Sequence, residues 1–148
     1  MRIEKDFKEF IELLNKNSVR YLIVGGYAFS FYAESRFTKD IAFFVEGSED
    51  NAERLLNALA EFGFKSIGLS KDDFIKPGDI VQLGFPPVRI DLMTSVTGLD
   101  FAAAWENRVT GNYGDIPAFF VSKADLIRNK MAVGRKQDIG DVERLQKI

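Results

Sequence analysis

The chain has 148 residues, a formal net charge of −2 and a hydrophobic content of 46%, with fourteen phenylalanines. This length and composition predict one folded domain over residues 1–148 and exclude a disordered chain. Cysteine and histidine are absent, which excludes disulfides, thiol nucleophiles, imidazole bases and sulfur-ligated zinc. Any acid–base or metal chemistry must therefore use carboxylates, lysines and tyrosines, and oxygen ligands favour magnesium, manganese or calcium.

Hydropathy and charge bear on location and partners. No apolar stretch approaches the roughly 18 residues that cross a bilayer, and the N-terminal sequence MRIEKDFKEF is charged from its start, so we expect a cytoplasmic protein without membrane contact. From Ser122 to the C-terminus, seven basic residues stand against four acidic ones. Such a basic end suits a triphosphate or a single-stranded acceptor, although on charge alone a solvated helix face is the better explanation.

The first half of the chain alternates helical and strand patterns. A first helix is predicted by an apolar stripe at helical spacing, formed by Phe7, Phe10, Ile11 and Leu14. For a later helix, Ser48 is a plausible N-cap and Gly63 a good C-terminal stop. The expected elements are a helix over residues 3–17, a strand over 19–24, a short helix over 27–33, a strand over 40–45 and a helix over 49–62.

The second half favours short strands followed by helices. Pro86-Pro87 suits a connection between antiparallel strands, Gly111-Asn-Tyr-Gly114 has the composition of a hairpin turn, and Ser122-x-x-Asp125 is similar to a capping box at a helix start. The expected elements are strands over residues 64–69, 80–85, 88–93, 108–110 and 116–121, a helical turn over 100–105, and helices over 122–133 and 138–146, with 70–79 as a loop. Together these patterns predict an α/β fold, α+β in stricter usage, with a mixed, twisted sheet of about five strands. We expect the helices to pack mainly on one side of this sheet.

Two acids and a glycine pair form the candidate site. Gly25-Gly26 follows a buried strand, where the backbone must turn sharply or approach a ligand closely, and the amides of the next helix suit a phosphate. Strand alternation places Asp40 on one face with Ala42 and Phe44. Taken singly, each feature has an ordinary explanation: a tight turn for the glycines and a cap for Asp40.

Asp91 lies on the strand over residues 88–93 and shares a face with Arg89 and Met93. Two charges two residues apart on a central strand are costly unless they have partners. Asp91 is therefore either a metal ligand or one half of a buried ion pair with Arg89 or Arg36.

The combination resembles a known signature. Gly25-Gly26, then Arg36-x-Thr38-x-Asp40-Ile, then Arg89-Ile-Asp91-Leu is similar to the pattern of the nucleotidyltransferase superfamily, which has the DNA polymerase β-like fold. It is most similar to the small bacterial members, which include toxin–antitoxin nucleotidyltransferases and antibiotic-modifying enzymes. The resemblance implies transfer of a nucleoside monophosphate from a nucleoside triphosphate, such as ATP, to a hydroxyl acceptor. It also implies Mg²⁺ or Mn²⁺ as the cofactor.

The resemblance assigns roles to individual residues. Asp40 and Asp91 would hold the metal, and Asp91 would help to deprotonate the acceptor hydroxyl. Lys130 would contact the triphosphate, Arg135 or Lys136 would assist it, and Asp138 and Asp141 would orient these cations or cap the last helix. The remaining residues expected near the phosphates are Gly25, Gly26, Ser30, Arg36, Thr38 and Lys39. Without the resemblance, Lys130 is better explained as a surface lysine.

The chain departs from the family pattern at Ala42, where the family has an acid that is shared by both metal ions. Loss of such a group commonly lowers the rate by about 10²-fold or more, so we expect an impaired or inactive enzyme. A recent or engineered inactivation and a natural pseudoenzyme both fit, and a single loss in an otherwise complete motif favours the first. The alternative is a non-catalytic, antitoxin-like binding module with the same fold.

The acceptor and partners stay open at this stage. A tRNA end, a protein hydroxyl and an antibiotic-like small molecule are all compatible with the motif. Toxin-like modification of RNA or protein is favoured because no second, drug-binding domain is visible. An antitoxin partner or a homodimer would fit the hypothesis of a toxin-like enzyme.

Overall fold

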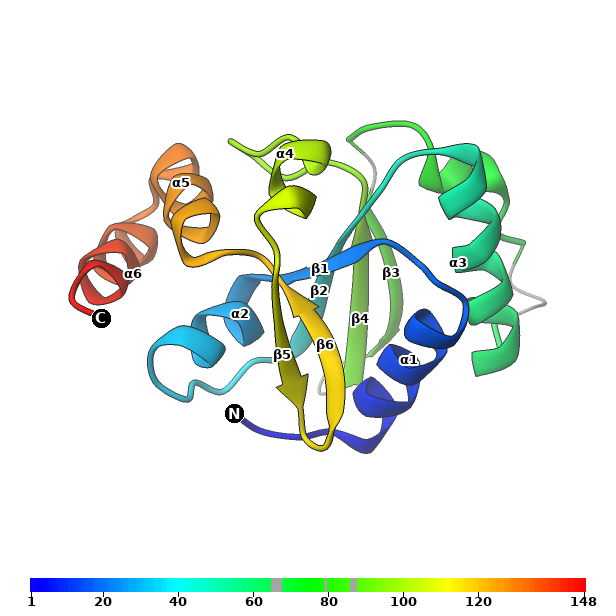
Figure 1. Cartoon of the computed structure of the whole chain (residues 1–148), viewed down its shortest axis with the longest axis horizontal. Coiled ribbons are helices and arrows are strands. Elements are labelled where there is room, and N and C mark those ends of the chain that lie inside the picture. The colour runs from blue at the N-terminus through cyan, green and yellow to red at the C-terminus, as the bar shows by residue number, and fades with distance from the viewer. Residues whose placement is uncertain (65–67, 79, 86–87) are drawn as a thin grey trace.

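The computed structural model describes residues 1–64, 68–78, 80–85 and 88–148, and it consists of a mixed sheet with helices on both faces (Figure 1). The strands are β1 (Tyr21–Val24), β2 (Asp40–Val45), β3 (Ile80–Phe85), β4 (Val88–Met93), β5 (Val109–Tyr113) and β6 (Ile116–Phe120). The helices are α1 (Lys5–Lys16), α2 (Gly25–Tyr32), α3 (Glu49–Phe62), α4 (Phe101–Glu106), α5 (Lys123–Val133) and α6 (Lys136–Gln146). Within the described ranges, no helix is both long and apolar enough to cross a bilayer.

The sheet order is β3-β4-β2-β1-β6-β5. β2 runs parallel to β4 and β1 parallel to β6, and the other neighbouring strands are antiparallel. In this register Ala42 lies beside Val24 of β1 and beside Asp91 of β4. The end of β1, the first half of β2 and the middle of β4 therefore meet at position 42.

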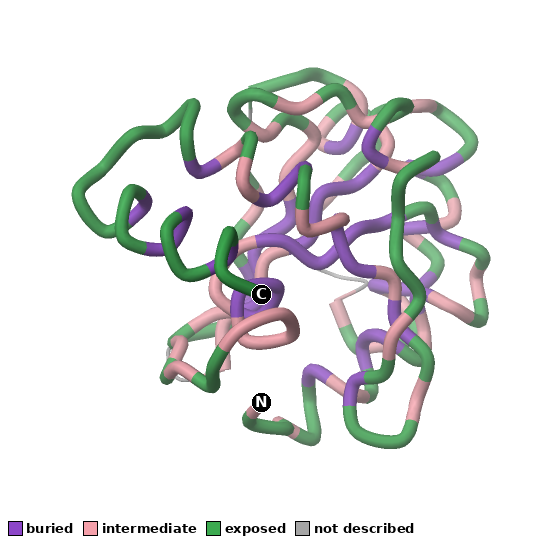
Figure 2. The backbone as a smooth tube through the Cα atoms, turned by 60° about the vertical axis from the view of Figure 1, so that its left-hand side comes forward, coloured by how far each residue is buried: buried purple, intermediate pink, exposed green. Residues whose placement is uncertain are grey.

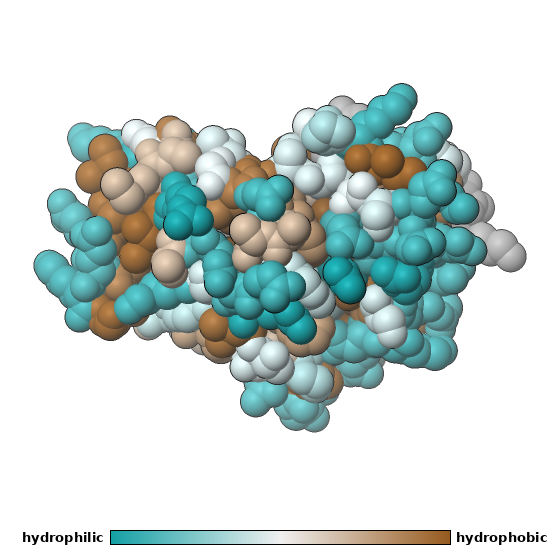
Figure 3. Space-filling model, turned by 45° about the horizontal axis from the view of Figure 1, so that its top comes forward, coloured by the Kyte–Doolittle hydropathy of each residue, from teal (hydrophilic) through white to brown (hydrophobic). Residues whose placement is uncertain are grey.

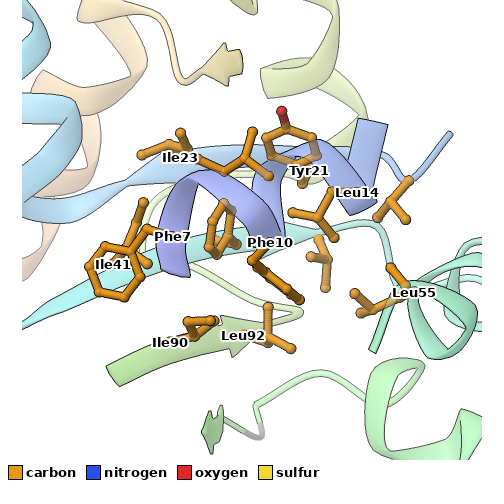
Figure 4. Close-up of a cluster of buried hydrophobic side chains, with 14 of the residues drawn as sticks. Phe7, Phe10, Leu14, Tyr21, Ile23, Ile41, Leu55, Ile90 and Leu92 are labelled. Atoms are coloured by element: carbon orange, nitrogen blue, oxygen red, sulfur yellow. The ribbon is translucent and has the colours of Figure 1, made fainter. Parts of the chain in front are cut away.

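One face of the sheet is covered by α1 and α3. The expected stripe of Phe7, Phe10 and Leu14 is fully buried and packs over Tyr21 and the neighbouring strands (Figure 4). Burial of one large apolar side chain contributes about 1.5–3 kcal/mol, so this stripe is sufficient to hold α1 on the sheet.

The opposite face carries a second apolar cluster. Leu22 of β1 and Phe44 of β2 meet Leu126 of α5 and Leu145 of α6 there, and α2 contributes Phe29. The buried segments in Figure 2 accordingly run through the central strands and along single sides of the helices. Asp40, Ala42 and Asp91 belong to this second face, as strand alternation predicts.

The predicted helix ends at residues 48, 63 and 122 are confirmed. The Ser48 hydroxyl accepts a hydrogen bond from the Asn51 amide at 3.2 Å, and the Ser122 hydroxyl accepts one from the Asp125 amide at 3.1 Å. Gly63 ends α3 with φ 110°, a left-handed conformation that favours glycine.

Several expectations are corrected by the structure. Among the described residues the sheet has six strands, which agrees with the expected count of about five, but β5 extends to Tyr113 through most of the segment expected to be a turn. The helices cover both faces rather than mainly one, because the central strands are apolar on both sides.

Other differences concern element bounds. α2 begins at Gly25 itself, the first half of the expected loop 70–79 forms a 3₁₀ helix over Lys71–Phe74, and α6 begins at Lys136. The core of the strand expected over 64–69 and the Pro86-Pro87 connection lie outside the described residues.

Candidate functional site

Three central strands bring the predicted acids and glycines together. Asp40 lies beside Arg89 in the β2–β4 register, and Ala42 lies beside Asp91. A Cβ atom built on Gly25 would stand 3.6 Å from the Ala42 Cβ atom. The glycine pair, both acids and the position of the absent acid thus share one small region of the second face.

Arg89 bridges the two acids. Its Nη2 atom donates to Asp40 Oδ2 at 3.2 Å and to Asp91 Oδ2 at 3.2 Å, while its Nε atom donates to Asp91 Oδ1 at 3.0 Å. The Asp91 side chain is 8% exposed, whereas Arg89 and Asp40 are 29% and 33% exposed. We call Asp40, Arg89 and Asp91 the acid-rich cluster; its formal charge is −1.

The acid-rich cluster changes the acidity of Asp91. Burial and the neighbouring Asp40 carboxylate raise the pKa of Asp91 to about 6, against the opposing effect of Arg89. A carboxyl group with a pKa near neutrality can exchange a proton with an acceptor hydroxyl more readily than an ordinary aspartate can.

Gly25 and Gly26 form the start of α2. Gly25 has φ 69°, and a Cβ atom on Gly26 would overlap the Thr38 methyl group, so the turn requires glycine at both places. No side chain among the described residues caps this helix, and its first turn contains no acid. The first amides of α2 are therefore available to an anion.

A second ionic cluster joins the loop before β2 to the last two helices. Arg36 donates to Asp141 through two nitrogens, at 3.0 and 2.7 Å, although the residues are 105 positions apart. Lys130 is buried, with its Nζ atom 2.7 Å from Asp141 Oδ2 and 3.7 Å from Asp138 Oδ1. Together with Arg135 these residues form the base-rich cluster, whose formal charge is +1.

The base-rich cluster rests on α2. The Arg36 guanidinium lies 4.0 Å from the centre of the Phe29 ring, and Lys130 Nζ lies 5.7 Å from it. Phe29 is one helical turn beyond the glycine pair, so both cations lie along the same helix as the free amides. Cations over an aromatic face gain additional electrostatic stabilisation.

The other predicted residues occupy supporting positions. Ser30 accepts a hydrogen bond from the Arg36 amide at 3.2 Å, and Lys39 is exposed. Arg135 is 71% exposed and its Nε atom lies 2.8 Å from Asp138 Oδ2. Asp138 also accepts from the Arg135 backbone amide at 3.1 Å, so it both orients a cation and caps α6.

The residues present do not fit a two-metal cluster. Such a cluster needs several carboxylates with free oxygens, but Ala42 supplies a methyl group, and both remaining acids already accept hydrogen bonds from Arg89. In the described part of the chain, no group of three acids is placed to hold a metal ion.

The contact of Arg89 with Asp40 was not predicted from the sequence. The sequence indicated Arg89 only as a possible ion-pair partner of Asp91. The available signal was the Arg-x-Asp spacing, which places both side chains on one strand face. The link to Asp40 depends on the β2–β4 pairing, which no local pattern reveals.

Comparisons with known proteins identify the family. A family described as a nucleotidyltransferase of unknown function (DUF6036) matches residues 2–146. Among solved structures, the lincosamide antibiotic adenylyltransferase LnuA, with lincomycin bound, is similar with a TM-score of 0.57 and 15% identity, over 98% of this chain and 97% of that chain. A search of curated proteins gave no match. Because the family match spans nearly the whole sequence, this chain belongs to the DUF6036 family of nucleotidyltransferases.

Proposed function

We propose that this chain binds a nucleoside triphosphate along α2, with the phosphates between the glycine pair and the base-rich cluster. The helix start provides backbone amides and the positive end of the helix dipole. Arg36 and Lys130 provide two cations one turn further along, where Lys130 acts as a point charge and Arg36 as a planar fork. A polar cavity of about 460 Å³ opens on the α6 side of this cluster, where it is lined by Arg36 and by residues of α6 that include Asp141.

The proposed reaction is nucleotidyl transfer to a hydroxyl. The acceptor oxygen forms a bond to the α-phosphorus, the bond from that phosphorus to the β-phosphate oxygen breaks, and pyrophosphate leaves. Asp91 takes the hydroxyl proton, which suits its raised pKa. One observation supports this assignment most: Asp40, Asp91 and Gly25 converge on the position of Ala42.

Ala42 makes this activity weak or absent in the present chain. The family cofactor, Mg²⁺ or Mn²⁺, belongs to a form of the site with an acid at position 42. The register places a side chain at position 42 directly between Gly25 and Asp91, so an aspartate there adds its carboxylate to the same face as Asp40.

The acceptor class is a tRNA end, a protein hydroxyl or a small molecule. The similar solved structure puts small-molecule acceptors on the same footing as RNA or protein. The present chain aligns with 97% of the lincosamide adenylyltransferase chain, and the structure of that enzyme has lincomycin bound. Small hydroxylated molecules therefore belong in the acceptor screen on equal terms.

A non-catalytic binding module is the second candidate. Met131, Val133 and Ile139 are exposed on α5 and α6, and apolar side chains gather at that end of the molecule (Figure 3). An exposed apolar patch is typical of an interaction surface. An antitoxin-like partner or a second copy of the chain would cover it.

The test compares Ala42→Asp with Ala42→Asn, which has the same shape without the charge. Each protein is incubated with ATP, CTP, GTP or UTP, Mg²⁺ and candidate acceptors, and the acceptors are examined for a mass increase of one nucleotide. We expect Ala42→Asp to transfer nucleotide at a rate at least about 10²-fold above that of the parent, and Ala42→Asn to show no such increase. If Ala42→Asp transfers no nucleotide and calorimetry detects no nucleotide binding to any variant, the hypothesis of a non-catalytic binding module replaces the hypothesis of a nucleotidyltransferase.

A further inference from the structure

The acid-rich cluster already contains a cation. Arg89 contacts Asp40 and Asp91 simultaneously through three hydrogen bonds of 3.0–3.2 Å. A guanidinium is permanently charged and planar, and its fork matches carboxylate oxygens. The same oxygens are the ones that a divalent cation would need.

The backbone holds Arg89 in this place. It precedes Asp91 by two residues on β4, so both side chains leave the same face of the strand, and it lies directly beside Asp40 in the parallel register. The pairing of β2 with β4 is therefore enough to position the guanidinium between the two acids. No movement of a loop or helix is required.

The charge of the cluster supports the same conclusion. Two acids and one arginine carry −1, and a divalent cation would have to displace or lie against the guanidinium. An acid at position 42 would change the total to −2, and so would loss of the Arg89 charge. Affinity for divalent cations depends strongly on the number of charged ligands.

We propose that Arg89 is a resident cation that occupies the place of the divalent metal ion in this chain, so that a triphosphate binds here without Mg²⁺ or Mn²⁺. Part of this inference rests on the proposed function, because it assumes a triphosphate along α2. The exclusion of the metal by Arg89 stands independently, since it depends only on contacts within the acid-rich cluster.

The first experiment titrates Mn²⁺ alone, followed by the electron paramagnetic resonance signal of the free ion. The proteins are the parent, Ala42→Asp, Arg89→Met and the double variant Ala42→Asp/Arg89→Met. The two single variants form a matched pair, because each changes the cluster charge from −1 to −2. Arg89→Lys, which keeps the charge without the fork, is the control for folding and for charge.

We expect no Mn²⁺ binding by the parent or Arg89→Lys, measurable binding by each of the other single variants, and binding by the double variant at least about tenfold tighter than by Ala42→Asp. Mn²⁺ binding by the parent overturns the proposal. Equal affinities of Ala42→Asp and the double variant also overturn it, because Ala42 alone would then explain the loss of metal.

The second experiment uses the unaltered protein and so does not depend on the folding of any variant. Triphosphate affinity is measured by calorimetry in EDTA and in excess Mg²⁺, and we expect values that agree within about twofold. A strong dependence on Mg²⁺ overturns the proposal. Failure to bind any triphosphate in either buffer overturns the proposed function instead, and the Mn²⁺ titration still decides the role of Arg89.

Discussion

The acid-rich and base-rich clusters lie on the same side of the sheet but differ in charge, burial and construction. The acid-rich cluster has two acids around one arginine, is built from adjacent strands, and keeps Asp40 and Arg89 partly exposed. The base-rich cluster has three bases and two acids, joins distant segments, and buries Lys130, Asp138 and Asp141. The comparison teaches that the acids alone do not define the proposed site: in the function proposed above, the positive charge for a triphosphate is supplied by the base-rich cluster.

The largest expected effect concerns Lys130. Lys130→Met removes a buried cation and leaves Asp138 and Asp141 with less compensation, which should lower the free energy of unfolding by about 3 kcal/mol. Urea denaturation measures the change. Lys136→Met on α6 is the control, since Lys136 is exposed, and its change should stay within about 0.5 kcal/mol. Equal effects of the two substitutions would show that the base-rich cluster adds no specific stability.

Substitutions in the two clusters should affect nucleotide affinity differently. Arg36→Gln should weaken binding of a triphosphate in EDTA about tenfold, because it removes a charge-assisted contact to the phosphates. Asp40→Asn should leave affinity unchanged or strengthen it about twofold, since it removes a nearby negative charge. Calorimetry measures both affinities, with Arg20→Gln, immediately before the start of β1, as the control. Weaker binding by Asp40→Asn in EDTA would contradict this expectation, because no divalent cation is then present for Asp40 to hold.

The smallest effect is a difference in pH dependence. The pKa of Asp91 is raised from 3.8 to about 6, so this residue contributes stability that is present below pH 3.8 and lost as the pH rises through 6. Burial acts to raise the pKa of Asp141, but hydrogen bonds from Arg36 and Lys130 outweigh it and lower the pKa. Asp141 therefore contributes stability above pH 3.8 that is lost as the pH falls through its lowered pKa.

Urea denaturation from pH 3 to pH 7 of the parent, Asp91→Asn and Asp141→Asn checks these signs. Relative to Asp91→Asn, the parent should lose stability between about pH 4 and pH 6. Relative to Asp141→Asn, the parent should lose stability only as the pH falls below about 4. Parallel pH profiles for all three proteins would contradict the contrast between the clusters.

Much of the fold and part of the site follow from local sequence. The α1 stripe, the caps at Ser48 and Ser122 and the left-handed Gly63 depend on spacing and backbone preference within a few residues, so the sequence alone predicted them. Strand alternation likewise placed Asp40 with Ala42, and Asp91 with Arg89, on single faces. The family motif then related these faces to the glycine pair.

Only the tertiary structure decided which charges became partners. The Arg36–Asp141 pair spans 105 residues, and Arg89 reaches Asp40 across a β2–β4 pairing that spans 49. Lys130, which by itself looks like a surface residue, is buried because α6 packs over it and supplies two acids. The sequence determines which side chains share a face of one element, whereas the pairing of charges between elements depends on strand order and helix packing, because electrostatic partners are selected by distance in space.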